Sequence, residues 1–309
     1  METRVLNYFL KIAQLNNMSK AAEQLHITQP TLSRQIKTLE DSLGTKLFNR
    51  DNKKMTLTNS GIIFQKRAQQ IVQLIAKAEQ DVSDQQGLSG VVSIGCVEST
   101  VTNFLGTMIA SFHSKYPHVR FSMYDADGDD IREKLDRGTV DLGFLLTPVE
   151  LAKYNSVDLP VEDRWCLLVP KDDPIAKQTK ISLEALRKLP LIIPSRNIIQ
   201  SEILAWAKTP DSELHIVSSQ NLLSNSLFLV KAGIGYAICA SGAFSNRPDD
   251  DIVSIPIDTT TVIKHAMAWR KNYTLSQSTQ TFIEFIKDEI NNPDSLWQLY
   301  IKEKREKEN

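Results

Sequence analysis

Residues 18–48 constrain this chain more strongly than any other stretch, because they predict two short helices joined by a tight turn. Ser19 can cap the first helix, whose apolar face is formed by three residues: Ala21, Ala22 and Leu25. After a break at residues 26–28, Pro30 falls in the first turn of the second helix, where proline is favoured. Gly44 then ends this second helix, as glycine commonly does.

The second of these helices has one apolar face and one polar face. Its apolar residues recur at spacings of four, three and four and so predict a buried stripe: Leu32, Ile36, Leu39 and Leu43. Its opposite face carries side chains that can donate hydrogen bonds to phosphates or base edges: Ser33, Arg34 and Lys37. This pattern fits a helix-turn-helix whose second helix enters the major groove of DNA. An ordinary helical hairpin in a protein core has the same periodicity and is the alternative.

Residues 21–50 also match a known pattern at many fixed spacings. The run A-A-x-x-L-x-x-x-Q-P-x-x-S-x-x-I-x-x-L-E-x-x-L-G-x-x-L-F-x-R resembles the N-terminal signature of LysR-type transcriptional regulators. Three shorter segments resemble parts of the effector domain of that family: Y-P-H-V at 116–119, G-T-V-D-L-G at 138–143 and A-G-I-G at 232–235. The chain departs from the family at Ser241 and Gly242, where a proline often follows the last of these segments.

The resemblance implies an α/β protein with an N-terminal winged helix-turn-helix, a long linker helix and a C-terminal effector domain. That effector domain consists of two Rossmann-like subdomains, similar to type 2 periplasmic binding proteins. We place the winged helix-turn-helix domain at 1–58, with the helix-turn-helix at about 18–37, and the dimerisation helix at 59–88. The regulatory domain then covers 89–309, with subdomain I at 91–161 and 267–309 and subdomain II at 162–266.

The charge of the chain is unevenly distributed. The net charge is −1 overall, but residues 1–67 contain 11 Lys and Arg against 5 Asp and Glu, a net of +6. Residues 68–309 contain 25 Lys and Arg against 32 Asp and Glu, a net of −7. A basic head on an acidic body suits a head that binds a polyanion such as double-stranded DNA. A chance division of solvated charge is the alternative.

Two short extended segments, residues 47–50 and 55–57, flank a turn at 51–54 and predict a hairpin, or wing, with basic residues at its tip. Wing lysines commonly approach the minor groove or its phosphates; a solvated turn is the alternative for each of them. The second helix should contact DNA through residues at its start or outer face: Gln29, Pro30, Thr31, Ser33 and Arg34. Phosphate contacts are expected mainly from Lys37, Arg50, Lys53 and Lys54.

A long helix is predicted after the wing. Thr58 can cap it, and apart from Gly61 near its start no breaker interrupts residues 59–86. Six residues at alternating spacings of four and three form a heptad seam: Phe64, Ala68, Ile71, Ile75, Ala78 and Val82. Such a seam requires a partner helix and so favours a homodimer, and the resemblance implies that dimers can pair into a homotetramer. Packing of the seam against the chain's own body is the alternative.

From residue 91 the pattern changes to alternating strands and helices, which predicts largely parallel sheets with helices on both faces. Strands are expected at 91–97, 119–124, 140–146, 164–169, 191–193, 214–218, 235–240, 252–257 and 264–269. Helices are expected at 101–115, 129–137, 183–188, 199–208, 221–232, 276–290 and 294–305. The chain should pass between two half-domains near residues 159–164 and return through residues 266–270.

Three loops that follow expected strands are candidates for binding a small molecule. A helix is expected to start beside Ser99 and Thr100, and the free N–H groups at a helix N-terminus favour an anion or a carbonyl oxygen. Open α/β sheets usually bind ligands at this position. The resemblance implies that all three loops line the cleft between the subdomains: Ser99, Thr100, Thr147, Pro148, Ser195 and Arg196.

The charges near this cleft point in two directions. Arg196 can pair with a carboxylate of a small-molecule effector, whereas Glu98 would repel an anion. An ordinary helix cap is the alternative for Ser99 and Thr100, and a solvated surface position is the alternative for Arg196. The sequence does not specify which effector binds.

Other classes of protein find little support in the sequence. The five histidines show no metal-ligand spacing, and no G-x-S-x-G, H-E-x-x-H or P-loop motif is present, so we expect no enzyme, no metal and no cofactor. Cys96, Cys166 and Cys239 lie in separate apolar runs and indicate buried thiols in a reducing compartment; a redox-sensing pair is the alternative. Neither a signal peptide nor a run long enough to cross a membrane is apparent, so we expect a cytoplasmic protein without membrane contact.

These observations together predict a LysR-type DNA-binding transcriptional regulator. The resemblance implies a homo-oligomer that binds a dyad promoter site and a small-molecule effector that changes the spacing of its heads. That change would alter DNA bending and the access of RNA polymerase. The alternative is a cytoplasmic solute-binding module with a basic interaction head, which would show no salt-sensitive binding to a dyad DNA site.

Overall fold

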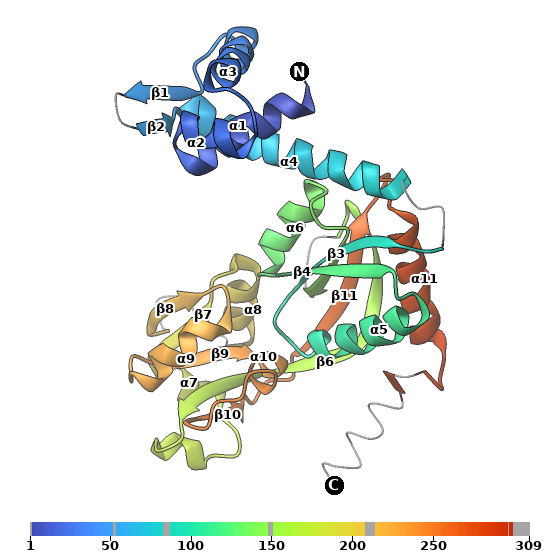
Figure 1. Cartoon of the computed structure of the whole chain (residues 1–309). Coiled ribbons are helices and arrows are strands. Elements are labelled where there is room, and N and C mark those ends of the chain that lie inside the picture. The colour runs from blue at the N-terminus through green and yellow to red at the C-terminus, as the bar shows by residue number, and fades with distance from the viewer. Residues whose placement is uncertain are drawn as a thin grey trace. The chain divides into compact units, whose positions relative to one another are not determined.

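The computed structural model describes residues 2–51, 54–82, 87–147, 151–207, 214–295 and 297–298. The chain forms two compact units, Met1–Ser83 and Asp84–Asn309 (Figure 1). Each unit has its own hydrophobic core, and each is described by itself below.

The N-terminal unit contains four helices and a two-stranded antiparallel sheet among its described residues: α1 (Thr3–Leu15), α2 (Met18–Gln24), α3 (Gln29–Leu43), β1 (Phe48–Asp51), β2 (Lys54–Leu57) and α4 (Asn59–Val82). This order confirms the expected helix-turn-helix, formed by α2 and α3, and the expected wing, formed by β1 and β2. The long helix is described as α4 as far as Val82, and its expected continuation over residues 83–86 lies outside the described residues.

Local hydrogen bonds explain where the helices of the helix-turn-helix begin and end. Thr28 caps α3 by accepting a hydrogen bond from the backbone N–H of Thr31, and Pro30 lies in the first turn. Gly44 ends α3 with a φ of +67°, a left-handed conformation that glycine adopts without strain. The expected cap of α2 was wrong: the side chain of Asn17, and not Ser19, accepts the hydrogen bond at its start.

The core of this unit forms around Phe9 of α1, which is fully buried. Its ring centroid lies 5.1 Å from that of Phe48 and 5.0 Å from that of Phe64, so α1 is joined to both the wing and α4. The apolar stripe of α3 is buried at three of its four expected positions: Leu32, Ile36 and Leu39. The fourth expectation was wrong, because Leu43 is the last residue of α3 and its side chain is 41% exposed.

The heptad seam of α4 is partly used by this same core. Phe64, Ala68 and Ile71 pack against the helices of the N-terminal unit, and Ala68 is fully buried within the single chain. Packing against the chain's own body, the alternative interpretation, therefore holds for the first half of the seam. Farther along α4, Ile75 is half-buried and Ala78 is exposed, whereas the side chain of Val82 lies outside the described residues.

A buried carboxylate joins α3 to the wing. Glu40 is 1% exposed, and its Oε1 accepts hydrogen bonds from the backbone N–H groups of Leu47 and Phe48, at 2.8 and 3.2 Å. Its Oε2 lies 3.3 Å from the ammonium group of Lys46. These bonds fix the strand that follows α3, and they could not be predicted from the sequence, because they join residues of different elements.

The C-terminal unit contains nine strands among its described residues: β3 (Gly90–Cys96), β4 (Val119–Asp125), β5 (Leu142–Leu146), β6 (Tyr154–Pro170), β7 (Leu191–Pro194), β8 (Ile216–Gln220), β9 (Tyr236–Ala240), β10 (Ile252–Pro256) and β11 (Val262–Arg270). Its α-helices are α5 (Val101–Lys115), α6 (Gly128–Asp136), α7 (Leu183–Leu186), α8 (Asn197–Ala207), α9 (Leu223–Lys231), α10 (Ser241–Ser245) and α11 (Gln277–Asn291). A short 3₁₀ helix, η1 (Pro174–Lys177), and α10 were not expected, and the expected helix at 294–305 lies mostly outside the described residues.

Two groups of parallel strands are joined by two long antiparallel strands, in the order β4-β3-β5-β11-β6-β9-β7-β8, with β10 paired to β6. β3 is parallel to β4 and β5, and β7 is parallel to β8 and β9, which confirms the expected parallel pairing. β6 and β11 pair with each other, and each also pairs with one of the two groups: β11 with β5 and β6 with β9. These two strands therefore connect the two halves of the unit (Figure 1).

The passage strand β6 is longer than the expected strand at 164–169, because it begins at Tyr154. Its first half contains Pro160 and several charged residues, which weaken the apolar pattern of a strand. The pairing with β11 shifts at this point, since His265 pairs with Leu159 whereas Lys264 pairs with Glu162. One core takes its buried apolar residues from 92–161 and 267–297, and the two other cores of the unit take theirs from 165–263.

Candidate functional site

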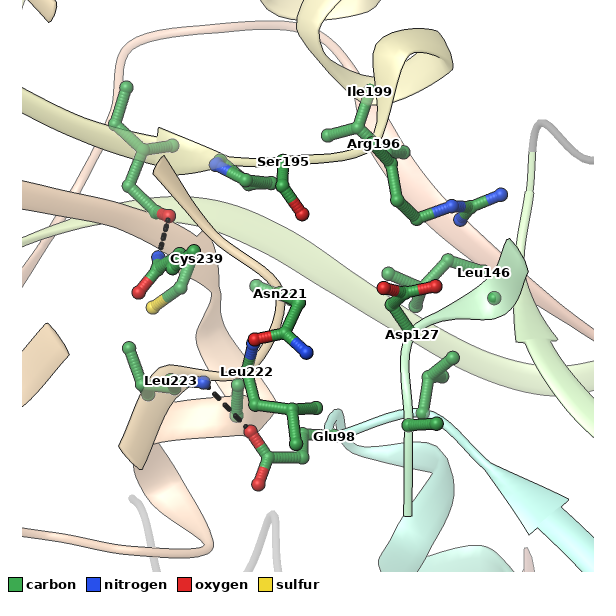
Figure 2. A pocket seen from close by; sticks show the side chains of 18 of the residues that line it. Glu98, Asp127, Leu146, Ser195, Arg196, Ile199, Asn221, Leu222, Leu223 and Cys239 are labelled. Carbon is green, nitrogen blue, oxygen red and sulfur yellow. Dashed lines mark hydrogen bonds between the residues drawn. The ribbon is translucent and has the colours of Figure 1, made fainter. Parts of the chain in front are cut away.

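A pocket lies where the parallel strands of both halves of the C-terminal unit end. Its polar lining comes from the loops after β3, β4 and β7 and from the end of β8: Glu98, Asp127, Ser195, Arg196, Gln220 and Asn221. Apolar side chains form much of the remainder, among them Leu146, Trp165, Ile199 and Leu222 (Figure 2). The space it encloses, part of it open to solvent, is about 600 Å³. Its position at the carboxyl ends of the strands is the usual ligand position of open α/β sheets.

Arg196 is the buried cation of this pocket, with only 7% of its surface exposed. Its Nη2 donates a hydrogen bond of 3.2 Å to Asp129, whereas Nε and Nη1 are buried without a hydrogen-bond partner among the described residues. Burial alone would raise the pKa of Asp129, but hydrogen bonds from Arg132 and Arg196 lower it. A Cβ added to Gly128 would lie 2.8 Å from Nη1, so the guanidinium of Arg196 would have to move to accommodate it. Two buried, unpaired N–H donors beside a pocket are suited to binding an oxyanion.

The carboxylate of Glu98 is neutralised by its neighbours. Its Oε2 accepts a hydrogen bond of 2.9 Å from the backbone N–H of Leu223 at the start of α9 (Figure 2), and its Oε1 lies 2.8 Å from the guanidinium of Arg247. A carboxylate at the N-terminus of a helix is also stabilised by the helix dipole. The repulsion of an anion that the sequence suggested at Glu98 is therefore largely compensated.

Thr100 and Ser99 do not line this pocket, contrary to expectation. The backbone N–H and the hydroxyl of Thr100 both donate to the carboxylate of Asp163, at 2.9 and 2.8 Å. Ser99 is fully buried and shares a hydrogen bond of 2.8 Å with Nε2 of His265. The N-terminus of α5 does attract an anion, but the anion is a side chain of the same protein.

The carboxylate of Asp163 is surrounded by hydrogen-bond donors from two helices and one strand. Besides Thr100, it accepts hydrogen bonds from the hydroxyl of Ser241 and the N–H of Gly242 at the start of α10, at 2.7 and 2.6 Å. Nε2 of His265 lies 3.3 Å from its Oδ2. Burial alone would raise the pKa of Asp163, but the hydrogen bonds from His265, Ser241 and Thr100 lower it to about 2. A Cβ at Gly242 would lie 2.0 Å from the nitrogen of Thr100, which explains the glycine at this departure from the family pattern.

Of the remaining residues expected in the cleft, some line the pocket and others do not. Ser195 and Arg196 line the pocket. Thr147 is absent from its lining, since both its N–H and its hydroxyl donate to the carbonyl oxygen of Lys264, at 2.8 and 3.2 Å, and Pro148 lies outside the described residues.

Sequence reasoning missed Gln220, which closes one side of the pocket. Its Nε2 donates a hydrogen bond of 3.0 Å to the carbonyl oxygen of Ile238, and this bond fixes the orientation of the amide. Its Oε1 is therefore the free atom, buried and without a hydrogen-bond partner among the described residues. Its position at a strand end is a signal for such a site: Gln220 is the last residue of β8, just as Pro194, the residue before Ser195, is the last residue of β7.

On the N-terminal unit, the polar face of α3 is open to solvent. Gln29, Pro30, Thr31, Arg34 and Lys37 are exposed and Ser33 is half-buried. The hydroxyl of Thr31 shares a hydrogen bond of 2.8 Å with that of Thr28, so it stands near the N-terminus of the helix. In the wing, Lys53 lies outside the described residues, as do the side chains of Arg50 and Lys54.

Comparisons with known proteins identify the family. Residues 3–62 match the helix-turn-helix of bacterial regulatory proteins of the lysR family, and residues 85–291 match the LysR substrate binding domain. The chain therefore belongs to the LysR family of transcriptional regulators, proteins that combine these two domains.

Relatives of known name span almost the same architecture. The chain is 29% identical to the transcriptional regulator AlsR of Bacillus subtilis (strain 168), over 79% of this chain and 82% of AlsR. It is 27% identical to the Hca operon transcriptional activator HcaR of Escherichia coli (strain K12), over 94% of this chain and 98% of HcaR. A crystal structure of full-length CbnR with its target DNA superposes with a TM-score of 0.77 at 24% identity, covering 93% of this chain and 99% of CbnR. At that identity the likeness concerns the fold.

Two kinds of feature are absent from the described residues. None of their helices combines the length and the apolar character that a membrane span requires. They also bring together no group of three or more His, Cys, Asp and Glu side chains that could hold a metal ion.

Replacement of Asp163 by Asn tests whether its charge holds the C-terminal unit together. We expect a loss of roughly 3 to 5 kcal/mol in unfolding free energy at pH 7, because the buried donors lose an ionised acceptor. The folded-state pKa of about 2 lies below the ordinary 3.8, so the wild-type advantage is full above pH 4 and is lost as the pH falls toward 2. That pH-dependent part amounts to about 2 kcal/mol. Denaturant unfolding of both proteins from pH 7 to pH 3 should show about half of this part, roughly 1 kcal/mol, because pH 3 still lies above the folded-state pKa.

Thr100→Val is the matched control, since it removes one hydroxyl donor and leaves the charge of Asp163. It should cost about 1 kcal/mol at every pH in this range. A difference between wild type and Asp163→Asn that stays constant with pH would contradict the account.

Proposed function

We propose that this protein is a transcriptional regulator that binds a dyad promoter site through α3 and the wing and responds to a small anionic effector in the pocket of its C-terminal unit. The observation that carries the proposal is the coexistence, in one chain of the LysR family, of an exposed polar recognition helix and a pocket with a buried, partly unpaired arginine. The alternative of a solute-binding module finds less support, because its head would need no such helix.

The DNA contacts follow from exposure and chemistry. Gln29, Thr31 and Arg34 lie at the start or on the outer face of α3, where side chains reach base edges in the major groove. Lys37 lies farther along the helix, and with Arg50, Lys53 and Lys54 of the wing it neutralises phosphates. Pro30 and Ser33 lie beside these residues and fix the approach of the helix.

Replacement of Arg34 by Ala should weaken binding to the specific site by about 1–3 kcal/mol, because the guanidinium loses its base contact. Replacement of Lys37 should weaken specific and nonspecific binding alike and reduce the salt slope by about one charge. Fluorescence anisotropy on a DNA fragment selected by the full-length protein, at several salt concentrations, measures both effects. Arg67→Ala is the control, because Arg67 is an exposed arginine of α4 hydrogen-bonded to Gln70. Unchanged affinity of a folded Arg34→Ala protein would remove Arg34 from the DNA interface.

The effector should carry a carboxylate or a similar anionic group. The guanidinium of Arg196 offers it a positive charge and N–H donors on Nε and Nη1 that have no partner among the described residues, and the apolar lining covers the rest of the molecule. Oε1 of Gln220 adds an acceptor, which favours an effector that also carries a hydroxyl or amino group. Ser195 is exposed at the edge of the same pocket. Ser99, Thr100 and Thr147 contribute indirectly, through the contacts that hold the pocket walls.

Replacement of Arg196 by Gln should abolish the preference for anions. Binding of a set of small carboxylates, each paired with its neutral amide, can be measured by thermal shift and calorimetry. We expect the wild type to bind a carboxylate and not its amide, and the variant to lose about ten- to a hundredfold in affinity, the loss of a charge-assisted hydrogen bond. Arg120→Gln, at an exposed position of β4, is the matched control. Equal affinity of Arg196→Gln and wild type for the carboxylate would refute this role.

A homodimer, or a homotetramer built from dimers, should form through α4, but not through the whole seam expected from the sequence. Phe64, Ala68 and Ile71 already serve the core of one chain. Ile63 and Leu74 remain 66% and 39% exposed on α4. They are eleven residues apart, which is close to three helical turns, so they share a face. We propose that this face docks on a second copy, with Ile75, Ala78 and Val82 continuing toward the end of the helix.

Replacement of Ile63 by Glu should produce monomers, because a charge would be buried against the partner helix, while the exposed position leaves the single chain intact. Light scattering measures the mass. Gln69→Glu places the same charge on another exposed face of α4 and should leave the mass unchanged. Wild-type mass for Ile63→Glu would mean that the copies meet elsewhere.

The relatives are transcriptional regulators, and we propose that this chain regulates and does not catalyse. A DNA target also favours the cytoplasm as its location. In this proposal the effector changes the spacing of two heads on a dyad site, and so the bending of the DNA and the access of RNA polymerase. The boundaries 1–58, 59–88 and 89–309, with subdomains at 91–161 and 267–309 and at 162–266, remain part of this proposal.

A further inference from the structure

Two of the three cysteines, which lie far apart in the sequence, are neighbours in the fold. Cys166 of β6 and Cys239 of β9 are direct partners in the antiparallel pairing of the two strands. Their sulfur atoms lie 3.5 Å apart, and both side chains are almost fully buried, with exposures of 2% and 5%. The sequence alone showed only isolated thiols in apolar runs.

The backbone geometry of this pair suits a disulfide. Residues directly opposite each other on antiparallel strands point to the same face, with Cα atoms roughly 4.5 to 5.5 Å apart. Disulfides join Cα atoms about 4.4 to 6.8 Å apart. Rotation of the side chains is therefore enough to bring the sulfur atoms from 3.5 Å to bonding distance, and the strands need not separate.

The two thiols also differ in their chemistry. A hydrogen bond from the thiol of Cys239 lowers the pKa of Cys166, and the same contact, together with burial, raises the pKa of Cys239. The thiolate is the reactive form of cysteine, so Cys166 is the nucleophile of the pair. Cys239 belongs to the lining of the pocket, on the opposite side from Arg196 in Figure 2, and the sulfur of Cys166 lies 3.5 Å from that of Cys239.

We propose that Cys166 and Cys239 are a site of reversible oxidation, which closes to a disulfide when the protein meets a peroxide. The Cys166 thiolate attacks one peroxide oxygen: an S–O bond forms, the O–O bond breaks, and the leaving hydroxide takes the proton of the Cys239 thiol to become water. The Cys239 thiolate then attacks the sulfenic sulfur of Cys166. The S–S bond forms as the S–O bond breaks, and the second hydroxide leaves and is protonated to water. The two thiols lose two electrons and the peroxide gains them.

The disulfide would act on the pocket and on the passage strand together. Cys239 belongs to the pocket wall and follows Ile238, whose carbonyl oxygen holds the amide of Gln220. Cys166 follows Trp165 of the same wall and belongs to β6, which runs between both halves of the unit. Oxidation would therefore join two neighbouring strands of this pocket wall, β6 and β9, covalently.

Cys96 provides an internal control. It is 1% exposed, its hydrogen-bond partners are Val97 and Thr102, and burial raises its pKa to about 12. A thiol in that environment should not react under conditions that oxidise the pair.

The test is a count of free thiols in the full-length protein after treatment with hydrogen peroxide, followed by alkylation under denaturing conditions. The wild type should fall from three thiols to one, and a reductant such as dithiothreitol should restore three. Cys96→Ser should fall from two to none. Cys166→Ala should keep both remaining thiols, whereas Cys239→Ala should lose only the Cys166 thiol, as a sulfenic acid without a joined peptide. Mass spectrometry of the digested wild type should show the peptide of Cys166 joined to that of Cys239.

Three unreacted thiols in the folded wild type would overturn the proposal. So would thiol loss in the wild type that appears only as added oxygen, without a joined peptide, or equal thiol loss in both alanine variants. Circular dichroism checks that the variants are folded. The wild type and Cys96→Ser by themselves keep the test decisive if an alanine variant fails to fold, because both retain the pair.

Discussion

The carboxylate of Asp163 is the contact on which the C-terminal unit depends most. Asp163 belongs to β6, which passes between the two halves. Its carboxylate accepts hydrogen bonds from the starts of α5 and α10 and lies beside His265 of β11. A buried charge of this kind is stable only when its donors surround it. Asp163 therefore joins the halves of the unit beside the pocket, together with the ion pairs of Arg196 with Asp129 and of Glu98 with Arg247.

This arrangement changes where an effector can be recognised. The N-terminus of α5 would ordinarily be available to an anion, but here Asp163 occupies it. The remaining cationic donors lie across the pocket, on Arg196, whose guanidinium is fixed by Asp129 and fits against Gly128. Glu98 also lines the pocket, and its charge is compensated by Arg247 and by the start of α9. In the proposed function an anionic effector is recognised through a side chain, because the N-terminus of α5 is already occupied by Asp163.

The sequence predicted many of the structural features that depend on residues close together along the chain. Periodicity, Pro30 in the first turn and Gly44 at the end located α3, although the cap at Thr28 was not predicted. It could not predict contacts set by the fold: the partner of Thr100 is 63 residues away, and that of Cys166 is 73 residues away. Pro160 concealed the first half of β6, because a proline within a strand removes a ladder donor. Ala68 looked like part of a seam between chains until the packing of α4 showed it inside one chain.

Selection of genomic DNA fragments by the purified full-length protein, followed by affinity measurement at several salt concentrations, tests the central claim most directly. The account predicts fragments that share a dyad sequence and bind more weakly as salt rises, because phosphate contacts release counterions. It also predicts that a carboxylate bound in the pocket changes the affinity or the footprint on those fragments. Fragments without a common dyad, bound no better than random DNA, would contradict it.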